Sequence, residues 1–378
     1  MRMALELVFW TSAFLVVYSY LGYPLTLAAL AALRGLPPRP ADAAELPGIS
    51  IVVPVHNERG VLPAKLANLT GLDYPADRLQ IIFVSDGSTD GTSEWLRSTG
   101  AAIEVVDLPV RSGKAAGLNA GVAAARHEVV VFTDASIMLQ QHALQAIVAP
   151  LADPGIGCVS GEDHVGEGGE GLYGRYELMI RGLESRVHSV VGASGSFYAQ
   201  RRALCPTFPA GLAPDFFSVL RTVRAGSRAV TEPRAAGQMT AVSVRDEFGR
   251  KIRTVLRGIT TLGEERALLN PARYGVFAFE LWAHKVLRWL VPVFLVALLV
   301  SSVALAALAA RSPFFLVCAV AQGLFYLAAM AGALVPALNA SRVVRIAFFF
   351  TIANVAILVA WQRYVAGVRQ ELWAPSRR

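Results

Sequence analysis

Residues 49–58 read Ile-Ser-Ile-Val-Val-Pro-Val-His-Asn-Glu, an apolar run that ends in polar side chains. Residues 81–92 read Ile-Ile-Phe-Val-Ser-Asp-Gly-Ser-Thr-Asp-Gly-Thr and end in the same way. Strand-like runs at 103–106 and 129–132 follow, and helical patterns lie near 61–69, after Thr92, across 118–125 and near 142–151. Alternating strands and helices predict βαβ units and a mainly parallel α/β sheet. Ligands bind at the carboxyl ends of such strands.

The rest of the chain is unusually apolar. Of its 378 residues, 54% are hydrophobic, and long uncharged runs occupy residues 290–310 and 314–335. Residues 4–33 hold a single acidic side chain, Glu6, whereas the run 346–361 is near the lower limit of about 17 residues for a membrane span. One membrane helix is therefore expected before the central domain, and two or three after it. The first run is about twice the length of a signal-peptide core, which favours a retained anchor.

These patterns divide the chain into six parts. They are an N-terminal transmembrane anchor (1–34), a linker (35–48), an α/β domain (49–236), amphipathic interface helices (237–288), C-terminal transmembrane helices (289–362) and a basic tail (363–378). A Gly/Glu-rich patch at 166–171 is expected to be a mobile loop. One span before a cytoplasmic domain and three after it would place the tail outside, whereas its arginines favour the inside, so the number of spans stays open.

Charge and cysteine usage limit the function classes. The net charge of +7 suits an anionic membrane surface or a diphosphate ligand, although ordinary positive-inside bias explains most of it. The apolar spans argue against a nucleic-acid-binding protein. The three cysteines have no CxxC spacing, so a disulfide framework or zinc site is not expected, which fits a cytoplasmic domain. Hydrolase motifs and a Gly-x-Gly-x-x-Gly after the first strand are absent from the sequence.

Charged residues recur at strand ends and on loops. Asp86 lies among glycines that allow a tight turn, and alone it fits a surface turn or calcium loop equally well. Lys114 precedes a predicted helix whose N-terminus would favour phosphate, although a solvated loop lysine has the same local pattern. Asp134 follows the strand 129–132 and Asp215 precedes an apolar stretch, and each is alternatively a helix N-cap.

The order and residue patterns of these motifs resemble those of the family 2 glycosyltransferases, inverting enzymes of the cellulose and hyaluronan synthase-like type that use nucleotide-sugars. The resemblance covers residues 49 to about 258. It implies a GT-A fold attached to transmembrane helices, and a hexosyltransferase activity. The partners it implies are a UDP- or GDP-sugar donor, a saccharide or lipid-linked acceptor, membrane lipids and polysaccharide-export proteins.

The same resemblance assigns expected roles to residues. The nucleotide would contact Asp86 and the backbone around Pro54, His56 and Glu58, and Lys114 would contact its phosphates. Asp134 matches the first carboxylate of the family's Asp-x-Asp metal motif, which holds Mg²⁺ or Mn²⁺, while Ser136 replaces the second.

Two further motifs of the family lie closer to the C-terminus. Asp215 matches the catalytic base, although Pro214 stands where the family has a second acid. Residues 250–254 match the family's diphosphate-binding motif, in which Arg253 would bind the diphosphate and Thr254 replaces the tryptophan, and Arg257 falls on the same helical face one turn on. These arginines would equally suit lipid headgroups.

Three functions stay open on the sequence. The first is a multi-pass enzyme of the cell inner membrane, with a cytoplasmic catalytic domain, that transfers sugar to a growing polysaccharide or glycolipid. The second is a polyprenyl-phosphate glycosyltransferase, which needs no general base. The third is a non-catalytic membrane component of a polysaccharide synthesis complex, because Ser136, Pro214 and Thr254 depart from the family pattern.

Overall fold

A computed structural model describes residues 1–34, 45–165, 171–239, 244–308 and 313–369. Most of the expected linker, the expected mobile loop and most of the basic tail therefore lie outside the described residues. The chain forms two compact units. Among the described residues, the helical unit comprises residues 1–26, 244–256, 280–308 and 313–368, and the sheet unit comprises residues 27–34, 45–165, 171–239, 257–279 and 369.

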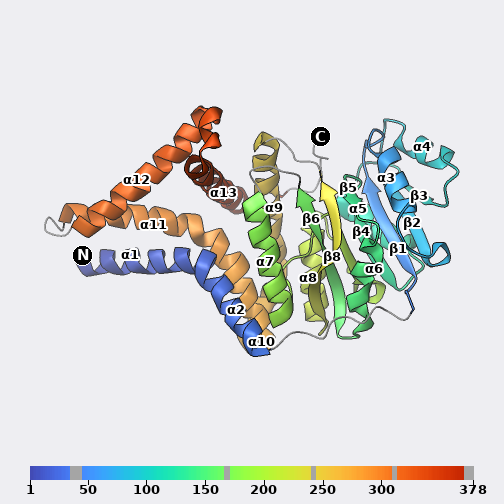
Figure 1. The fold of residues 1–378 in the computed structure, drawn as a ribbon, viewed down its shortest axis with the longest axis horizontal. Coiled ribbons are helices and arrows are strands. Elements are labelled where there is room, and N and C mark those ends of the chain that lie inside the picture. The colour runs from blue at the N-terminus through green and yellow to red at the C-terminus, as the bar shows by residue number, and fades with distance from the viewer. Residues whose placement is uncertain (35–44, 166–170, 240–243, 309–312, 370–378) are drawn as a thin grey trace. The chain divides into compact units, whose positions relative to one another are not determined.

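The sheet unit is built on one eight-stranded sheet among the described residues, with the strand order β3-β2-β1-β4-β7-β6-β8-β5 (Figure 1). The strands are β1 (Ile49–Val55), β2 (Leu79–Asp86), β3 (Glu104–Leu108), β4 (Val129–Thr133), β5 (Ile137–Leu139), β6 (Ile156–Val165), β7 (Phe197–Arg201) and β8 (Arg228–Met239).

The half of the sheet made of β3, β2, β1 and β4 is parallel, as the sequence predicted. All seven residues of β1 are buried, which explains the continuous apolar run. The other half is mixed: β7 runs antiparallel to β4 and β6, β6 and β8 are parallel, and β5 is antiparallel to β8. The expected domain boundary between residues 236 and 237 falls inside β8, because that strand continues to pair with β5 as far as Met239.

Helices cover both faces of the parallel half. Three leucines of α3, Leu62, Leu66 and Leu69, belong to the same buried cluster as Ile51 and Phe83. Helix α5 packs on the opposite face of β1. The helices of this unit are α3 (Leu62–Thr70), α4 (Thr92–Ser98), α5 (Lys114–Ala124), α6 (Ala143–Val148), α7 (Gly171–Val187) and α8 (Pro214–Arg224), with short turns η2 (Ala76–Arg78), η3 (Ala149–Ala152), η4 (Arg202–Leu204) and η5 (Arg266–Leu269).

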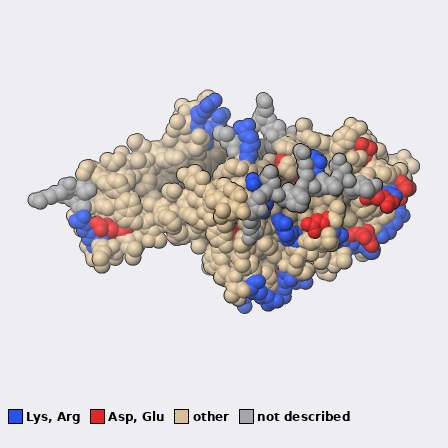
Figure 2. Space-filling model, turned by 60° about the horizontal axis from the view of Figure 1, so that its bottom comes forward, with Lys and Arg blue, Asp and Glu red and all other residues tan. Residues whose placement is uncertain are grey.

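The helical unit supplies most of the apolar sequence. Four helical stretches, Arg2–Leu33, Pro271–Leu308, Pro313–Leu334 and Arg342–Val365, are long and apolar enough to cross a membrane. Their elements are α1 (Arg2–Val17), η1 (Tyr18–Gly22), α2 (Tyr23–Arg34), α10 (Pro271–Leu281), η6 (Trp282–Val286), α11 (Leu287–Leu308), α12 (Pro313–Leu334) and α13 (Arg342–Val365), with η7 (Pro336–Ala340) before α13. On the face drawn in Figure 2, much of this unit's surface is uncharged.

Two features of these helices differ from the sequence interpretation. The C-terminal part of the expected interface segment 237–288 does not form a separate helix, because α10 continues through η6 into α11, with a kink at Gly275, whose φ is 50°. The expected short span at 346–361 is part of a 24-residue helix, α13. The other expected interface segment is α9 (Val244–Glu264), which the turn η5 separates from Pro271.

Contacts inside the helical unit are mostly apolar, with a few polar ones between helices. Phe9, Leu305 and Phe315 form a buried cluster. Gln322 donates to Ser302 at 3.1 Å, and the Trp361 indole donates to the carbonyl of Trp289 at 2.9 Å. Since lipid tails provide no hydrophobic drive for helices to associate, such contacts stabilise a bundle in a membrane.

Replacing Gly121 by alanine tests the packing of α5 on β1. A Cβ at Gly121 would lie 2.2 Å from Cγ1 of Val52, and overpacking of this kind costs about 1–3 kcal/mol. We therefore expect Gly121→Ala to lower the thermal unfolding temperature of the detergent-purified protein. The matched control is Gly182→Ala on α7, where a Cβ meets nothing within 4 Å and should be neutral or stabilising. Equal unfolding temperatures for both variants would contradict the close approach.

Candidate active site

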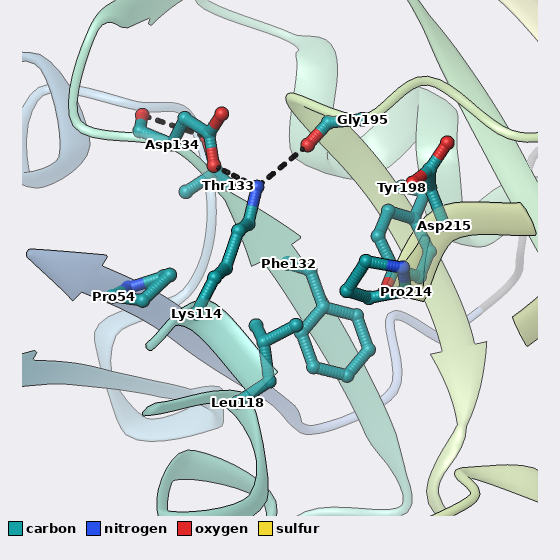
Figure 3. A pocket seen from close by; sticks show the side chains of 10 residues that line it. All are labelled: Pro54, Lys114, Leu118, Phe132, Thr133, Asp134, Gly195, Tyr198, Pro214 and Asp215. Atoms are coloured by element: carbon teal, nitrogen blue, oxygen red, sulfur yellow. Dashed lines mark hydrogen bonds and ion pairs between the residues drawn. The ribbon is translucent and has the colours of Figure 1, made fainter. Parts of the chain in front are cut away.

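A pocket opens at the carboxyl ends of β1 and β4, where the sequence predicted ligand binding (Figure 3). Its lining residues belong to the sheet unit, and they include predicted site residues from segments far apart in the chain. They are Pro54, Lys114, Leu118, Phe132, Thr133, Asp134, Gly195, Tyr198, Pro214 and Asp215.

An ion pair between Lys114 and Asp134 occupies one side of the pocket. Nζ of Lys114 lies 2.6 Å from Oδ1 of Asp134 and donates to the carbonyl of Gly195 at 3.0 Å. Both side chains are mostly buried, with 15% and 22% exposed. The solvated-lysine interpretation is therefore wrong. Asp134 is followed by a turn and β5, so the helix N-cap interpretation of this residue is wrong as well.

Asp86 holds the backbone just before α5, the helix that begins at Lys114. Its two carboxylate oxygens accept the backbone N–H groups of Ser112 (2.6 Å) and Gly113 (2.8 Å), the residues just before α5. Gly87 has a φ of 59°, and a Cβ there would lie 2.4 Å from the backbone nitrogen of Arg111. Asp86 is only 3% exposed. It is a structural anchor for the Lys114 loop, whatever contact it makes with a ligand.

The loops after β1 and β2 are joined to each other. His56 Nδ1 lies 2.6 Å from the carbonyl oxygen of Asp86. Asn57 has a φ of 52°, and its side-chain oxygen accepts the backbone N–H of Thr89 at 2.8 Å. The carbonyl of Glu58 accepts the N–H groups that begin α3. The predicted residues His56, Glu58 and Asp86 therefore lie in adjoining loops, and Asn57 is a positioning residue that the sequence analysis did not identify.

Asp215 lies on the other side of the pocket, beside Tyr198 and Pro214 (Figure 3). It is the second residue of α8, after Pro214, and the N-cap is Ala213, so the N-cap interpretation of Asp215 is wrong. The aromatic ring of Tyr198 stacks on Phe132 with 4.7 Å between centroids, and both rings line the pocket.

Residues beyond α8 brace the helix that carries Asp215. Ala213 donates its backbone N–H to Oγ1 of Thr261 at 2.9 Å. Near the other end of α8, Arg224 and Arg221 contact the buried carboxylate of Glu265 at 2.8 and 3.4 Å. The sequence analysis missed these contacts, because they join residues 40 to 50 positions apart without a recognisable motif.

A divalent metal would need ligands from outside the protein as well. Among the described residues, no three His, Cys, Asp or Glu side chains are grouped as a metal site. Asp134 presents a carboxylate to the pocket, and Ser136 lies in the turn that follows it, outside the lining residues. Mg²⁺ commonly takes one or two carboxylates and completes its shell with water and substrate phosphates, so this donor set fits a metal that arrives with a diphosphate.

Arg253 and Arg257 both lie on α9, one helical turn apart. Arg253 belongs to the helical unit and Arg257 to the sheet unit, and neither is a lining residue. Burial and the neighbouring Arg250 lower the pKa of Arg253. Their contact with a diphosphate stays a prediction.

Lys65 is a buried cation that the sequence analysis did not identify. It is 0% exposed, and its amine donates to the carbonyl of Ile137 (2.7 Å) and to Oγ1 of Thr133 (3.1 Å). Burial lowers the pKa of Lys65 to about 7, and the carboxylate of Asp134 partly opposes that shift. The sequence did contain a signal for this burial, because Lys65 falls on the same helical face as Leu62, Leu66 and Leu69.

The lowered pKa of Lys65 predicts a pH dependence of stability. Between pH 7 and about 10.5 the unfolded chain keeps a proton on Lys65 that the folded protein has lost, so stability rises with pH in that window. Lys65→Met removes this effect. From pH 7 to 9, the unfolding temperature of the wild type should therefore rise relative to that of Lys65→Met. A constant difference between the two proteins would show that the pKa is not lowered.

Comparison with known proteins agrees with this geometry. The profile of the family described as Glycosyl transferase family 2 matches residues 50–221. The solved structure of the mannosyltransferase PcManGT from Pyrobaculum calidifontis, in complex with GDP-Man and Mn²⁺, is similar with a TM-score of 0.73 and 25% identity, covering 96% of this chain and 99% of that one. The likeness therefore extends over both the sheet and the terminal helices.

Curated relatives match over shorter stretches. "Probable glycosyltransferase YdaM" of Bacillus subtilis (strain 168) is 27% identical over 186 residues, 45% of this chain and 44% of that protein. The poly-beta-1,6-N-acetyl-D-glucosamine synthase of Staphylococcus aureus (strain MSSA476) is 31% identical over 124 residues, 32% of this chain and 30% of that protein. The chain thus spans less than half the length of these relatives. Together, these comparisons show that residues 50–221 are similar to the glycosyl transferase family 2 model and that the chain has the GT-A fold of the solved mannosyltransferase.

Proposed function

We propose that this protein is a membrane-bound, inverting glycosyltransferase that moves a sugar from a nucleoside-diphosphate sugar to a saccharide or lipid-linked acceptor. The observation that carries the proposal is the pocket itself. It places a cation and a carboxylate, Lys114 and Asp134, on one side, and a separate carboxylate, Asp215, on the other. These are the groups needed to hold a diphosphate and to remove a proton.

The diphosphate would bind beside Lys114. This lysine is the first residue of α5, so its ammonium and the partial positive charge of the helix N-terminus act at the same place. A nucleoside attached to the diphosphate would then lie toward the loops of His56 and Asp86. Arg253 and Arg257 are proposed to add positive charge to the departing diphosphate.

Asp215 is proposed as the general base. It accepts the proton of an acceptor hydroxyl, whose oxygen attacks the anomeric carbon of the donor sugar. The bond from that carbon to the diphosphate oxygen breaks, and the nucleoside diphosphate leaves with the electron pair. A single displacement of this kind inverts the anomeric configuration.

A divalent cation, Mg²⁺ or Mn²⁺, is proposed to bind Asp134 together with the diphosphate, with Ser136 as a further candidate ligand. When bound, it neutralises negative charge on the leaving group. The solved PcManGT complex contains GDP-Man and Mn²⁺, which supports this proposal without choosing between the two metals. That complex and the poly-N-acetylglucosamine synthase relative support a nucleotide-sugar donor and a saccharide product.

The proposed location is the cell inner membrane, with the sheet unit on the cytoplasmic side; the four long apolar helices support the membrane part of this proposal. A non-catalytic role is less well supported, because Lys114, Asp134 and Asp215 lie together in one pocket despite the substitutions around them. A lipid-phosphate acceptor remains the alternative, since transfer to a phosphate would not require Asp215 as a base.

A donor panel is the first test. The detergent-purified protein should release nucleotide from one UDP- or GDP-sugar in the presence of Mg²⁺ or Mn²⁺, and EDTA should abolish this release. Extraction of radiolabelled product into organic solvent separates a lipid-linked product from a polysaccharide. Failure to consume any donor, even with membrane lipid extract or oligosaccharide added, would contradict the proposal.

Asp215→Asn tests the proposed base. Because the amide keeps the shape but cannot accept the proton, transfer should fall by about 10²–10⁴-fold while the affinity for the donor nucleotide stays close to that of the wild type. The matched control is Asp73→Asn, an exposed carboxylate that pairs with His142 outside the pocket. Equal losses of nucleotide binding and turnover would assign Asp215 to donor binding or structure, and full activity would favour the lipid-phosphate acceptor.

A further inference from the structure

Lys65 is buried in the apolar face of α3, in the core of the sheet unit. It has no exposed surface, and three leucines of the same helix are buried around it. Lysine is almost never fully buried unless its amine is paired, because removing the amine from water costs free energy that hydrogen bonds must replace. The hydrogen bonds of this amine therefore indicate what the residue does.

Both hydrogen bonds of Lys65 go to the turn that carries Asp134. Thr133, which accepts through its hydroxyl, is the last residue of β4, and Ile137, which accepts through its carbonyl, is the first residue of β5. The amine thus bridges the two sides of residues 134–136. Two N–H groups suffice for these bonds, so they form whether or not the amine is charged.

The same helix holds β5 at a second point. Asn68 donates to the carbonyl of Leu139 and accepts its backbone N–H, both at 2.8 Å. Strand β5 is at the edge of the sheet and pairs only with β8 among the described strands. The side chains of Lys65 and Asn68 therefore form hydrogen bonds with backbone groups of β5 that no neighbouring strand pairs with. The Lys65 amine contacts Ile137, directly after residues 134–136, whereas the Asn68 side chain contacts Leu139, two residues further along β5.

We propose that Lys65 is a positioning residue for metal and diphosphate binding: from beneath the pocket, its amine fixes the turn that presents Asp134 and Ser136. This inference rests on the proposed function, in which Asp134 binds a metal with the donor diphosphate. Asp134 is fixed from the other side by its backbone N–H, which donates to the carbonyl of Ser196 at 3.0 Å. Within the turn itself, the N–H of Ile137 donates to the carbonyl of Asp134 at 3.5 Å, and Lys65 joins this turn to α3.

The test compares Lys65→Met with Asn68→Leu, which both remove an anchor of β5. Binding of Mn²⁺ is measured from the electron paramagnetic resonance signal of the free ion, with the wild type and each variant in the presence of GDP or UDP. Lys65→Met should weaken Mn²⁺ binding about 10- to 100-fold, the loss typical when support of a metal ligand is removed. Asn68→Leu should bind Mn²⁺ like the wild type.

Unchanged Mn²⁺ affinity in Lys65→Met would overturn the inference. An equal loss of affinity in Lys65→Met and Asn68→Leu would also overturn it, because such a loss would reflect only the stability of β5. A wild type that binds nucleotide without Mn²⁺ dependence would instead contradict the metal site in the proposed function. If Lys65→Met does not fold, Thr133 provides the test. Thr133→Val, which lacks the accepting hydroxyl, should weaken Mn²⁺ binding, and Thr133→Ser should retain it. Equal affinities of these two variants would overturn the inference.

Discussion

Lys114 and Asp134 come from different elements of the sheet unit, and the 2.6 Å ion pair between them joins the start of α5 to the end of β4. A lysine–carboxylate pair stabilises a protein only weakly when its side chains are free to move. Here both partners are fixed by backbone contacts. Asp86 holds the loop that begins α5, and Ser196 accepts the N–H of Asp134. The geometry of the pocket depends on these anchors rather than on the pair alone.

The charges in the pocket explain why a diphosphate donor needs more than Lys114. Of the ten lining residues, one is basic and two, Asp134 and Asp215, are acidic. A diphosphate would add negative charge to a pocket that is already negative on balance. A divalent cation on Asp134, with arginines from α9, would restore the balance, and Lys114 would then exchange its carboxylate partner for phosphate.

Asp215 depends on a different set of supports. It lies in the first turn of α8, directly after Pro214. Thr261 and Glu265 hold the two ends of that helix; Thr261 lies in the last turn of α9, and Glu265 directly follows α9. The proposed base is therefore fixed by residues that lie beyond the sheet in sequence, in the segment that leads toward the apolar C-terminal helices.

The sequence predicted the parallel half of the sheet well, because buried parallel strands such as β1 form continuous apolar runs. It did not predict the other half. Strands β6 and β8 contain charged residues, glycine and Pro233, so their patterns do not differ clearly from loops. Four of the pocket residues, Pro54, Lys114, Asp134 and Asp215, were predicted from motif order. Lys65, Asn57 and Thr261 were not, because their contacts arise only when distant segments pair. Gly275 had a visible signal, since glycine permits the positive φ of the kink.

The most direct test of the proposed chemistry is an experimental structure of the protein with its nucleotide-sugar donor and Mn²⁺. The proposed function predicts that the diphosphate binds at Lys114 in place of Asp134, that the metal contacts Asp134, and that the anomeric carbon faces Asp215. A donor bound away from the Lys114–Asp134 pair, or with its sugar directed away from Asp215, would contradict it.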